Sequence, residues 1–272
     1  MRVIVLLCLL SAVSCAPAAT PTVTGAFGER PVIQVPAHRP EPTPAVTVLS
    51  EGSGPRTTRG DVVLAEVETR RWDGTKPYLS TYDTDQPVTV VLDGRHVSQA
   101  WERALADRPV GSRVMLVSPA HLGYGPRGTP AGAGGGETLV VVFDILAAYP
   151  PDARLVGRRL PGLPDTLRPG VLIDGSGPPV TRGARVVVQY VGARWPSRTV
   201  FDSSTARGGP SAVVLKEGAV PPGWVEGLAG RRVGSRVAIT TPAVATAGLT
   251  TGGMTVPAGT GLVYVVDIID VL

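Results

Sequence analysis

Short valine-rich runs alternate along the chain with turns that contain glycine, proline or aspartate. Runs of roughly four to eight β-branched and apolar residues, bounded by such turns, are typical of strands. The pattern predicts strands in both halves of the chain, at Val62–Val67, Val88–Leu92, Arg113–Val117, Leu139–Leu146, Arg185–Val191, Ala212–Leu215, Arg236–Thr240 and Leu262–Ile269. We therefore expect a mainly β protein.

One stretch in each half has helical spacing instead. The apolar positions of these two stretches are Val97, Trp101, Ala104 and Leu105 in the first half and Val220, Trp224 and Leu228 in the second. Ser98 stands where it would cap the first helix, and Pro221 is tolerable in the first turn of the second. Each half is thus predicted to contain strands and one short helix, an α+β composition dominated by β structure.

The two halves are copies of each other. "VLSEGSGPRTTRGDVV" near residue 48 resembles "VLIDGSGPPVTRGARVV" near residue 171, and an offset of 123 residues, the difference between Trp101 and Trp224, keeps the copies in step. A period this long indicates duplicated domains rather than a solenoid. The domains are expected at residues 47–149 and 170–272. The linker at 150–169 is rich in proline and arginine, and its reach rather than a rigid interface is expected to set their spacing.

The N-terminus has the organisation of an export signal, predicted over residues 1–14. Its end, Ala12-Val13-Ser14-Cys15, resembles a bacterial lipobox, which implies cleavage before Cys15 and lipid attachment to its sulfur. The alternative is an ordinary secretory signal with an incidental cysteine. Residues 15–46, rich in Pro, Ala and Thr, are expected to form an extended tether.

Composition excludes several kinds of chemistry. The net charge is only +4 and the arginines are scattered singly, so nucleic acid binding is not expected. Cys8 and Cys15 both lie in the N-terminal segment, and no disulfide framework is possible in the exported part. The histidines lack the spacing of a metal site, and no nucleophile elbow or phosphate loop is present. We expect no metal, nucleotide or redox cofactor.

Several ordered motifs occur in both copies. The second copy contains "VVVQYVG" at 186–192, "VFDSS" at 200–204, "VPPGWVEGL" at 220–228 and "GLVYVVDI" at 261–268, and the first contains "QAWERAL", "SPAHLGYG" and "TLVVVFDIL" in the corresponding order. In order and spacing this pattern resembles the FKBP-type peptidyl-prolyl isomerases over both repeats. The resemblance implies two tandem FKBP-like domains, each a curved antiparallel sheet wrapped around one short helix.

The resemblance also implies a site in the second domain. Its catalytic residues would be Tyr190, Phe201, Asp202, Trp224 and Tyr264, with Val220 and Pro221 as further substrate-binding residues. Phe201 and Trp224 would hold the proline ring, and Asp202 would orient the Tyr190 hydroxyl. The VFDSS serines are expected to be turn and hydrogen-bonding residues.

The first domain departs from this pattern. It keeps substrate-binding candidates at Tyr78, Val97, Trp101 and Tyr124. Val67, Leu79 and Val141 stand opposite Tyr190, Asp202 and Tyr264, however, and its pocket is predicted to be degenerate. The second domain has Ala247 opposite Tyr124, and Pro221 has no N–H to donate.

The resemblance implies a peptidyl-prolyl cis-trans isomerase that assists folding of exported proteins, with catalysis mainly in the second domain. Its partners would be proline-containing peptides and unfolded exported proteins. It would be anchored at the outer face of a bacterial cytoplasmic membrane, or would lie outside the cell if the protein is secreted. The alternatives are a non-catalytic peptide-binding or chaperone lipoprotein and a simple envelope spacer.

Overall fold

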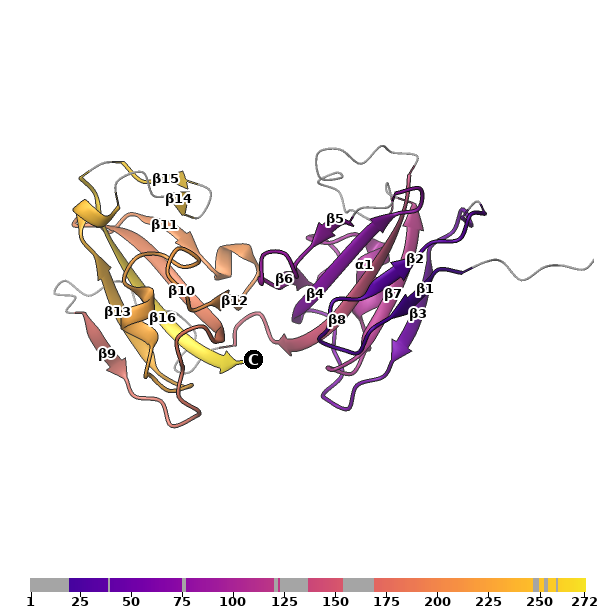
Figure 1. The fold of residues 1–272 in the computed structure, drawn as a ribbon. Coiled ribbons are helices and arrows are strands. Elements are labelled where there is room, and N and C mark those ends of the chain that lie inside the picture. The colour runs from indigo at the N-terminus through magenta and orange to yellow at the C-terminus, as the bar shows by residue number, and fades with distance from the viewer. Residues whose placement is uncertain are drawn as a thin grey trace, which may run out of the picture.

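The computed structural model describes residues 20–38, 40–74, 77–119, 122, 137–153, 169–246, 250–251, 254–257 and 259–272. Within them, each half of the chain folds into its own six-stranded antiparallel sheet with a short helix (Figure 1). The predicted α+β, mainly β architecture of two tandem domains is confirmed.

The sheet of the first domain has the order β3-β7-β8-β4-β5, and β6 also pairs with β4. Its strands are β3 (Ala45–Ser50), β4 (Val62–Arg71), β5 (Pro77–Ser80), β6 (Val88–Val91), β7 (Arg113–Pro119) and β8 (Thr138–Tyr149). The long central strands β4 and β8 are buried over most of their length, as expected for valine-rich runs between two packed layers.

The sheet of the second domain repeats this order as β11-β10-β16-β13-β9, with β12 also paired with β10. Its strands are β9 (Gly170–Ile173), β10 (Arg185–Trp195), β11 (Val200–Ser203), β12 (Ser211–Val214), β13 (Arg236–Thr241) and β16 (Gly261–Val271). Gly192 pairs with Asp202 as Thr69 pairs with Leu79, so the two domains keep the 123-residue offset in three dimensions. A small separate sheet contains β14 (Thr250–Thr251) and β15 (Met254–Thr255).

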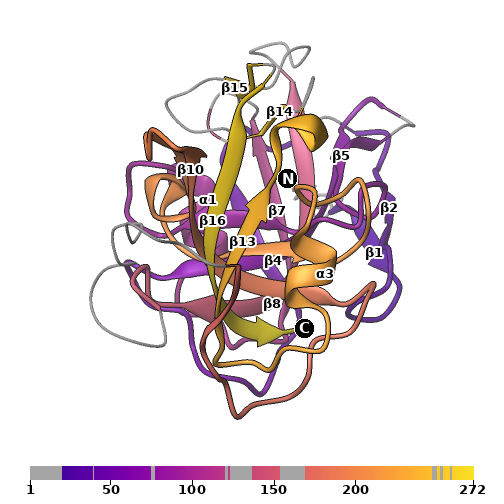
Figure 2. The ribbon, with the colours of Figure 1, turned by 90° about the vertical axis from the view of Figure 1, so that its left-hand side faces the viewer.

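A short helix packs on each sheet. In the first domain α1 (Gln99–Leu105) begins after Ser98, whose Oγ accepts a hydrogen bond from the Trp101 amide at 3.2 Å, so the predicted cap is confirmed. In the second domain α3 (Trp224–Leu228) begins later than the apolar spacing predicts, because Gly223 is in the left-handed conformation before it. Figure 2 shows α3 beside β13. The described residues of the second domain also form two 3-10 turns, η1 (Thr205–Arg207) and η2 (Ala243–Ala245).

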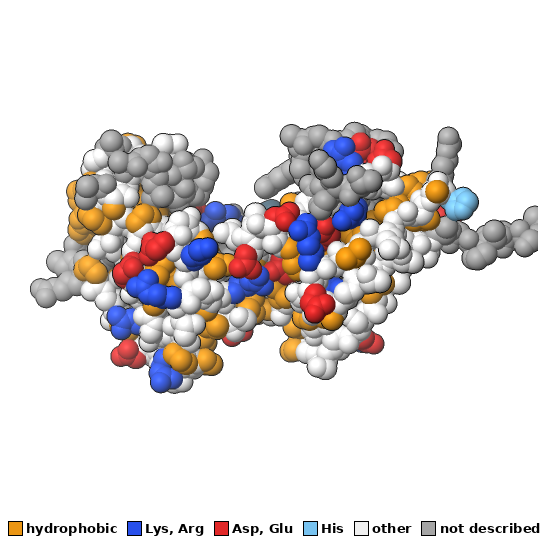
Figure 3. Space-filling model, in the orientation of Figure 1, with side chains coloured by type: hydrophobic (Ala, Val, Ile, Leu, Met, Phe, Trp, Pro, Cys, Tyr) orange, Lys and Arg blue, Asp and Glu red, His pale blue; other side chains and the backbone are white. Residues whose placement is uncertain are grey.

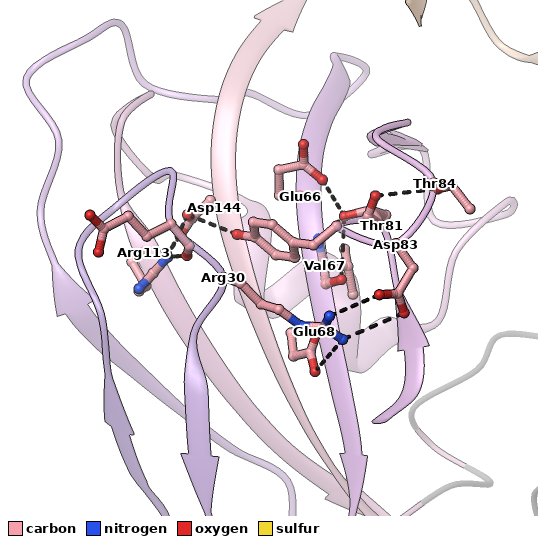
Figure 4. Close-up of polar contacts among 11 residues, drawn as sticks. Arg30, Glu66, Val67, Glu68, Thr81, Asp83, Thr84, Arg113 and Asp144 are labelled. Atoms are coloured by element: carbon pink, nitrogen blue, oxygen red, sulfur yellow. Dashed lines mark hydrogen bonds and ion pairs between the residues drawn. The ribbon is translucent and has the colours of Figure 1, made fainter. Parts of the chain in front are cut away.

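A buried arginine–aspartate pair joins neighbouring strands in each domain. Arg113 on β7 donates to both carboxylate oxygens of Asp144 on β8, at 2.6 and 2.7 Å (Figure 4). Arg236 and Asp267 make the same contacts at 2.5 and 2.6 Å. Because a buried charge without its partner is very unfavourable, each pair fixes the register of its two strands.

The segment before the first domain is partly folded. Strands β1 (Thr22–Thr24) and β2 (Val32–Gln34) form an antiparallel hairpin, and Arg113 donates to the carbonyl oxygen of Gly25 at 2.6 Å. Ile33 is buried in a cluster on the sheet formed by Met115, Val117, Val140 and Val142. The extended tether expected over residues 15–46 is therefore wrong for this hairpin, because it covers apolar residues of the first domain that would otherwise face water.

The two domains contact each other directly. Leu64 and Ala147 of the first domain are buried with Val187 of the second. The Tyr149 hydroxyl donates to Oδ2 of Asp270 across the contact at 2.8 Å. The expectation that only the linker sets the domain spacing is therefore wrong, since an apolar and hydrogen-bonded interface holds the domains together.

The described residues contain no helix long and apolar enough to cross a membrane. Among the same residues, no group of His, Cys, Asp and Glu side chains is arranged to hold a metal ion. Acidic and basic side chains are interspersed on the face shown in Figure 3, and neither sign forms a continuous stripe there.

Candidate active site

Four aromatic rings meet in the second domain. Tyr190 on β10 and Tyr264 on β16 pack edge to face with Trp224 of α3, with centroid distances of 5.2 and 5.4 Å, and Phe201 on β11 lies 5.9 Å from Tyr264. Trp224 and Tyr264 are almost completely buried, whereas Phe201 is half-buried. Edge-to-face contacts are the preferred geometry for such rings. One helix and three strands therefore bring the four rings together in one packed aromatic cluster.

Gly192 allows these rings to approach the backbone of β10. A Cβ atom at this position would lie 2.7 Å from Cε1 of Tyr264 and 3.0 Å from Cζ of Phe201. Only glycine leaves room at such distances. The first domain has Thr69 here, fully buried, so the same arrangement of rings is sterically closed to it.

A hydrogen-bonded carboxylate lies at the edge of the aromatic cluster. Oδ2 of Asp202 accepts hydrogen bonds from the Tyr190 hydroxyl and from Nη2 of Arg207, both at 2.8 Å. The Arg207 guanidinium also lies over the Tyr190 ring, 5.6 Å from its centroid, in a cation–π contact. These contacts fix the direction of the Tyr190 hydroxyl.

Burial affects both charged groups of this edge. It raises the pKa of Asp202, an effect opposed by the hydrogen bond from the Ser203 amide. It also lowers the pKa of Arg207. Partial removal from water disfavours the charged form of each group. The 2.8 Å contact between Arg207 Nη2 and Asp202 Oδ2 places the two groups side by side.

The two serines of VFDSS support the backbone around the site. Ser204 is fully buried, and its Oγ accepts from the Tyr190 amide at 2.9 Å and donates to Oε1 of Gln189 at 2.5 Å. The Ser203 hydroxyl accepts from the Ala206 amide at 3.1 Å and holds the turn that follows. Both side chains are hydrogen-bonding residues of the turn, as expected.

The segment before α3 borders the aromatic cluster on another side. Val220 is buried in the same cluster as Tyr190 and Trp224. The carbonyl oxygen of Pro221 accepts from the Trp224 amide at 3.1 Å, and Thr241 Oγ1 donates to the carbonyl oxygen of Pro222 at 2.7 Å. The two prolines thus hold the entry to the helix although they donate no backbone hydrogen bond.

The corresponding region of the first domain is filled differently. Trp101 packs edge to face with Phe143 at 4.8 Å, and Phe143 is fully buried. Val67 and Val141 are buried in the same core cluster, and Leu79 packs against it. Thr81, the counterpart of Ser204, donates to the carboxylate of Glu66, and its Oγ1 accepts from the Val67 amide at 2.8 Å (Figure 4). The backbone support is therefore kept, whereas Val67 and Leu79 stand where Tyr190 and Asp202 form the polar edge of the second domain.

Some predicted residues cannot be placed in a site. Tyr124, Ala247 and Cys15 lie outside the described residues, and Tyr78 lies on β5 with its side chain outside them. Val97 packs against the first-domain core beside Trp101.

Arg207 and Gly192 are site residues that the sequence reasoning missed. Arg207 lies in the "TARGGP" loop directly after VFDSS, and the first copy has Thr84 at the same offset, which is the signal that could have singled it out. Gly192 lies within the "VVVQYVG" motif, where the threonine of the other copy marks a difference in size.

Comparison with known proteins agrees with this geometry. The model of the FKBP-type peptidyl-prolyl cis-trans isomerases matches residues 54–146 and again residues 177–269. The chain belongs to this family. An FK506-binding protein of Streptomyces anulatus is 29% identical over 120 residues, which are 44% of this chain and 97% of that protein. The human peptidyl-prolyl cis-trans isomerase FKBP2 is 30% identical over 138 residues, which are 51% and 89% of the two chains.

Among solved structures, the three FKBP domains of wheat FKBP73 align with 84% of this chain and 94% of that chain, at 20% identity and a TM-score of 0.35. The two matches to the family model show that the chain is an FKBP-type peptidyl-prolyl isomerase with two tandem FKBP domains. Domains of this family bind proline-containing peptides.

Proposed function

We propose that the second domain catalyses cis-trans isomerisation of X-Pro bonds in its aromatic pocket. The observation that carries this proposal is the joining of the Tyr190 hydroxyl, the Asp202 carboxylate and the Arg207 guanidinium at the rim of the rings of Tyr190, Phe201, Trp224 and Tyr264. Nothing equivalent is found at Val67 and Leu79 in the first domain.

The chemistry needs no nucleophile. The barrier to rotation about an X-Pro bond, about 20 kcal/mol, arises from amide resonance. An apolar pocket lowers this barrier by removing water from the peptide group and by binding the twisted form more tightly than the planar one. Phe201 and Trp224 hold the proline ring, with Val220 and Pro221 beside them. Asp202 orients the Tyr190 hydroxyl toward the peptide without exchanging a proton.

The first domain, in this proposal, binds peptide weakly and contributes little catalysis. Trp101 in α1 and Val97 just before α1 remain in this domain, and Tyr78 and Tyr124 are further candidates for peptide contact. If one client reaches both domains, linked weak sites gain from effective concentration.

The second domain departs from the family pattern at two places. Ala247 lacks a hydroxyl and Pro221 lacks an N–H. Loss of one hydrogen bond costs on the order of 1 kcal/mol, so we expect a slower enzyme rather than an inactive one. The competing function is a chaperone that binds peptide without accelerating isomerisation, and these same two positions favour it.

We also propose export and attachment to the outer face of the cytoplasmic membrane through a lipid on Cys15. The stretch from Cys15 to Thr20, where the described residues begin, spans at most about 17 Å when extended. The hairpin over residues 22–34 would therefore hold the first domain close to the membrane. Fatty-acid labelling with mass spectrometry tests the anchor. An adduct in the parent that is lost in Cys15→Ala supports it, whereas an unmodified parent chain indicates secretion.

Isomerisation of short X-Pro peptides, followed by NMR exchange spectroscopy with the full chain, tests the enzymatic function. Tyr190→Phe should lower kcat/KM about three- to tenfold, because it removes one hydrogen bond at the rim. Tyr82→Phe is the matched control, since the Tyr82 hydroxyl donates to Asp144 in the first domain, away from the pocket. A parent chain that binds these peptides but does not accelerate their exchange would favour the chaperone.

A further inference from the structure

The loop that follows VFDSS lies between the two domains. On one side, Arg207 contacts Asp202 and Tyr190 in the second-domain site. On the other side, Ala206 and Arg207 line a cavity of about 360 Å³ together with first-domain residues Val88, Thr89, Val90, Val91, His96, Val97 and Trp101. In Figure 1 the turn after β11 faces the first domain at β6. One loop thus borders both the proposed active site and the neighbouring domain.

Two glycines bring this loop into direct contact with the first domain. Gly208 has φ 105°, and a Cβ there would lie 2.2 Å from Cγ2 of Val91. Gly209 has φ 143°, and its Cβ would lie 2.7 Å from Cγ2 of Val62 and 3.0 Å from the carbonyl oxygen of Pro151. Glycine is required here both by the positive φ and by the closeness of the other domain.

The contact is held at a fixed place by the rest of the interface. Arg185 of the second domain lies 2.8 Å from Oε1 of the buried Glu66 and also pairs with Asp85. One apolar cluster at the interface contains Leu64, Ala147 and Tyr149 from the first domain and Val187, Ala212 and Ile269 from the second. A packed and charge-paired contact resists sliding because interiors are close-packed.

Hydrogen bonds connect this interface to Arg207. Nε2 of Gln189 donates at 3.1 Å to the carbonyl oxygen of Pro151, which lies at the start of the linker directly after β8, and its Oε1 accepts from Ser204. The Ser204 carbonyl oxygen in turn accepts from the amides of Arg207, at 2.9 Å, and Gly209, at 3.1 Å. The backbone that carries Arg207 is thus held by contacts with Val91 and Val62 of the first domain and with Pro151 at the start of the linker.

We infer that the first domain positions the active-site loop of the second, with Val91 and Gly208 as the positioning pair. Their contact keeps Arg207 against Asp202 and Tyr190, so the second-domain site depends on the presence and placement of the first domain. This inference rests on the proposed function only for its catalytic consequence. The placement of the loop is a separate property of the chain.

A substitution in the first domain tests the inference without changing the sequence of the loop. In the full chain, Val91→Phe should push Gly208 away, lower kcat/KM for X-Pro peptides about tenfold and leave the thermal midpoint of the second domain in place. Val48→Phe makes the same change at an exposed position on β3 and should leave the rate unchanged. A Val91→Phe chain that is folded and has the parent rate would overturn the inference.

A second set of variants covers the possibility that Val91→Phe unfolds the first domain. Gly208→Ala places a methyl group against Val91, and adding Val91→Ala should restore at least half of the lost rate. Gly218→Ala is the matched control, because Gly218 also has a positive φ, 81°, but has open space where its Cβ would lie. If adding Val91→Ala does not restore the rate, the loss in Gly208→Ala comes from backbone strain in the loop alone and not from contact with Val91.

Hydrogen exchange gives a readout that does not depend on activity. The amides of Arg207, Gly208 and Gly209 are all hydrogen-bonded within the loop. Their exchange should become several times faster in Val91→Phe and in Gly208→Ala, and return toward the parent value in Gly208→Ala with Val91→Ala. If the parent chain is inactive, the proposed catalysis is wrong, but exchange still decides the positioning. Unchanged exchange in both single variants would refute it.

Discussion

Phe143 lies directly opposite Val67 across β8 and β4, at the register position where Val266 lies opposite Tyr190 in the second domain. In the first domain the large side chain, Phe143, is on β8 and the small one is on β4. In the second domain the large side chain, Tyr190, is on β10, the counterpart of β4, and the small one is on β16. Both cores stay filled, since Phe143 packs on Trp101 much as Tyr190 packs on Trp224. The exchange removes the ring that carries a hydroxyl from the first pocket.

This relationship predicts strong coupling between positions 67 and 143. Val67→Tyr alone should overpack the core against Phe143 and lower the free energy of unfolding by about 1–3 kcal/mol. Phe143→Val alone should leave a cavity and cost about 2 kcal/mol or more. The double variant should cost less than the sum, as measured by denaturant titration of all four chains. Additive losses would show that the two side chains do not compensate each other.

Gly192 is expected to be intolerant of even one methyl group. Gly192→Ala should reduce the free energy of unfolding by about 1–3 kcal/mol and weaken peptide binding, because the new Cβ collides with Tyr264 at the pocket wall. Gly261→Ala is the control on the neighbouring strand, where the nearest atoms are 3.7 Å away. Calorimetry with an X-Pro peptide measures both effects. Equal behaviour of the two variants would contradict the steric account.

The N-terminal hairpin is expected to contribute to the stability of the first domain. Ile33→Ala should lower the free energy of unfolding by about 2–5 kcal/mol, since Ile33 is buried on the sheet. Val32→Ala, at an exposed neighbouring position, should change it by less than about 0.5 kcal/mol. Similar small effects of both substitutions in denaturant titrations would mean that the hairpin does not hold to the domain in solution.

The domain interface should weaken in alkaline solution. Burial, followed by the hydrogen bond to Asp270, raises the pKa of Tyr149 above its usual 10.0. A group whose pKa is higher in the folded state stabilises the fold fully below its unfolded pKa and loses that contribution as the pH rises through and above about 10. The stability difference between the parent and Tyr149→Phe should therefore shrink from pH 8 to pH 11. A difference that stays constant over this range would contradict the assignment.

The architecture was predictable because the chain is duplicated, so that the same pattern of strands and one helix occurs in both halves of the sequence. The runs at 62–67 and 185–191 mark the central strands, and Trp101 and Trp224 mark the helices. The short strands β3, β9 and β11 are not among the strands predicted from the sequence. Strands β3 and β9 have few buried apolar positions, and β11 coincides with the VFDSS motif, which the resemblance assigns to the site.

The contacts between segments were not predictable from local patterns. Ile33 and Val187 are ordinary apolar residues in the sequence, and only the fold shows that one covers the first sheet and the other joins the domains. Arg207 and Gly208 could be noticed as an unusual loop, but the closeness of Val91 depends on how two whole domains pack. Such long-range packing has no periodicity along the chain.

The central claim is that the second domain carries the isomerase activity, and a matched pair of substitutions in the full chain tests it most directly. Asp202 and Leu79 occupy the same position in the two copies. The measurement is the rate of cis-to-trans exchange of an X-Pro peptide, detected without a coupled protease. We predict that Asp202→Ala lowers kcat/KM about tenfold whereas Leu79→Ala leaves it within about twofold of the parent. A parent chain without acceleration, or equal losses in the two variants, would contradict the claim.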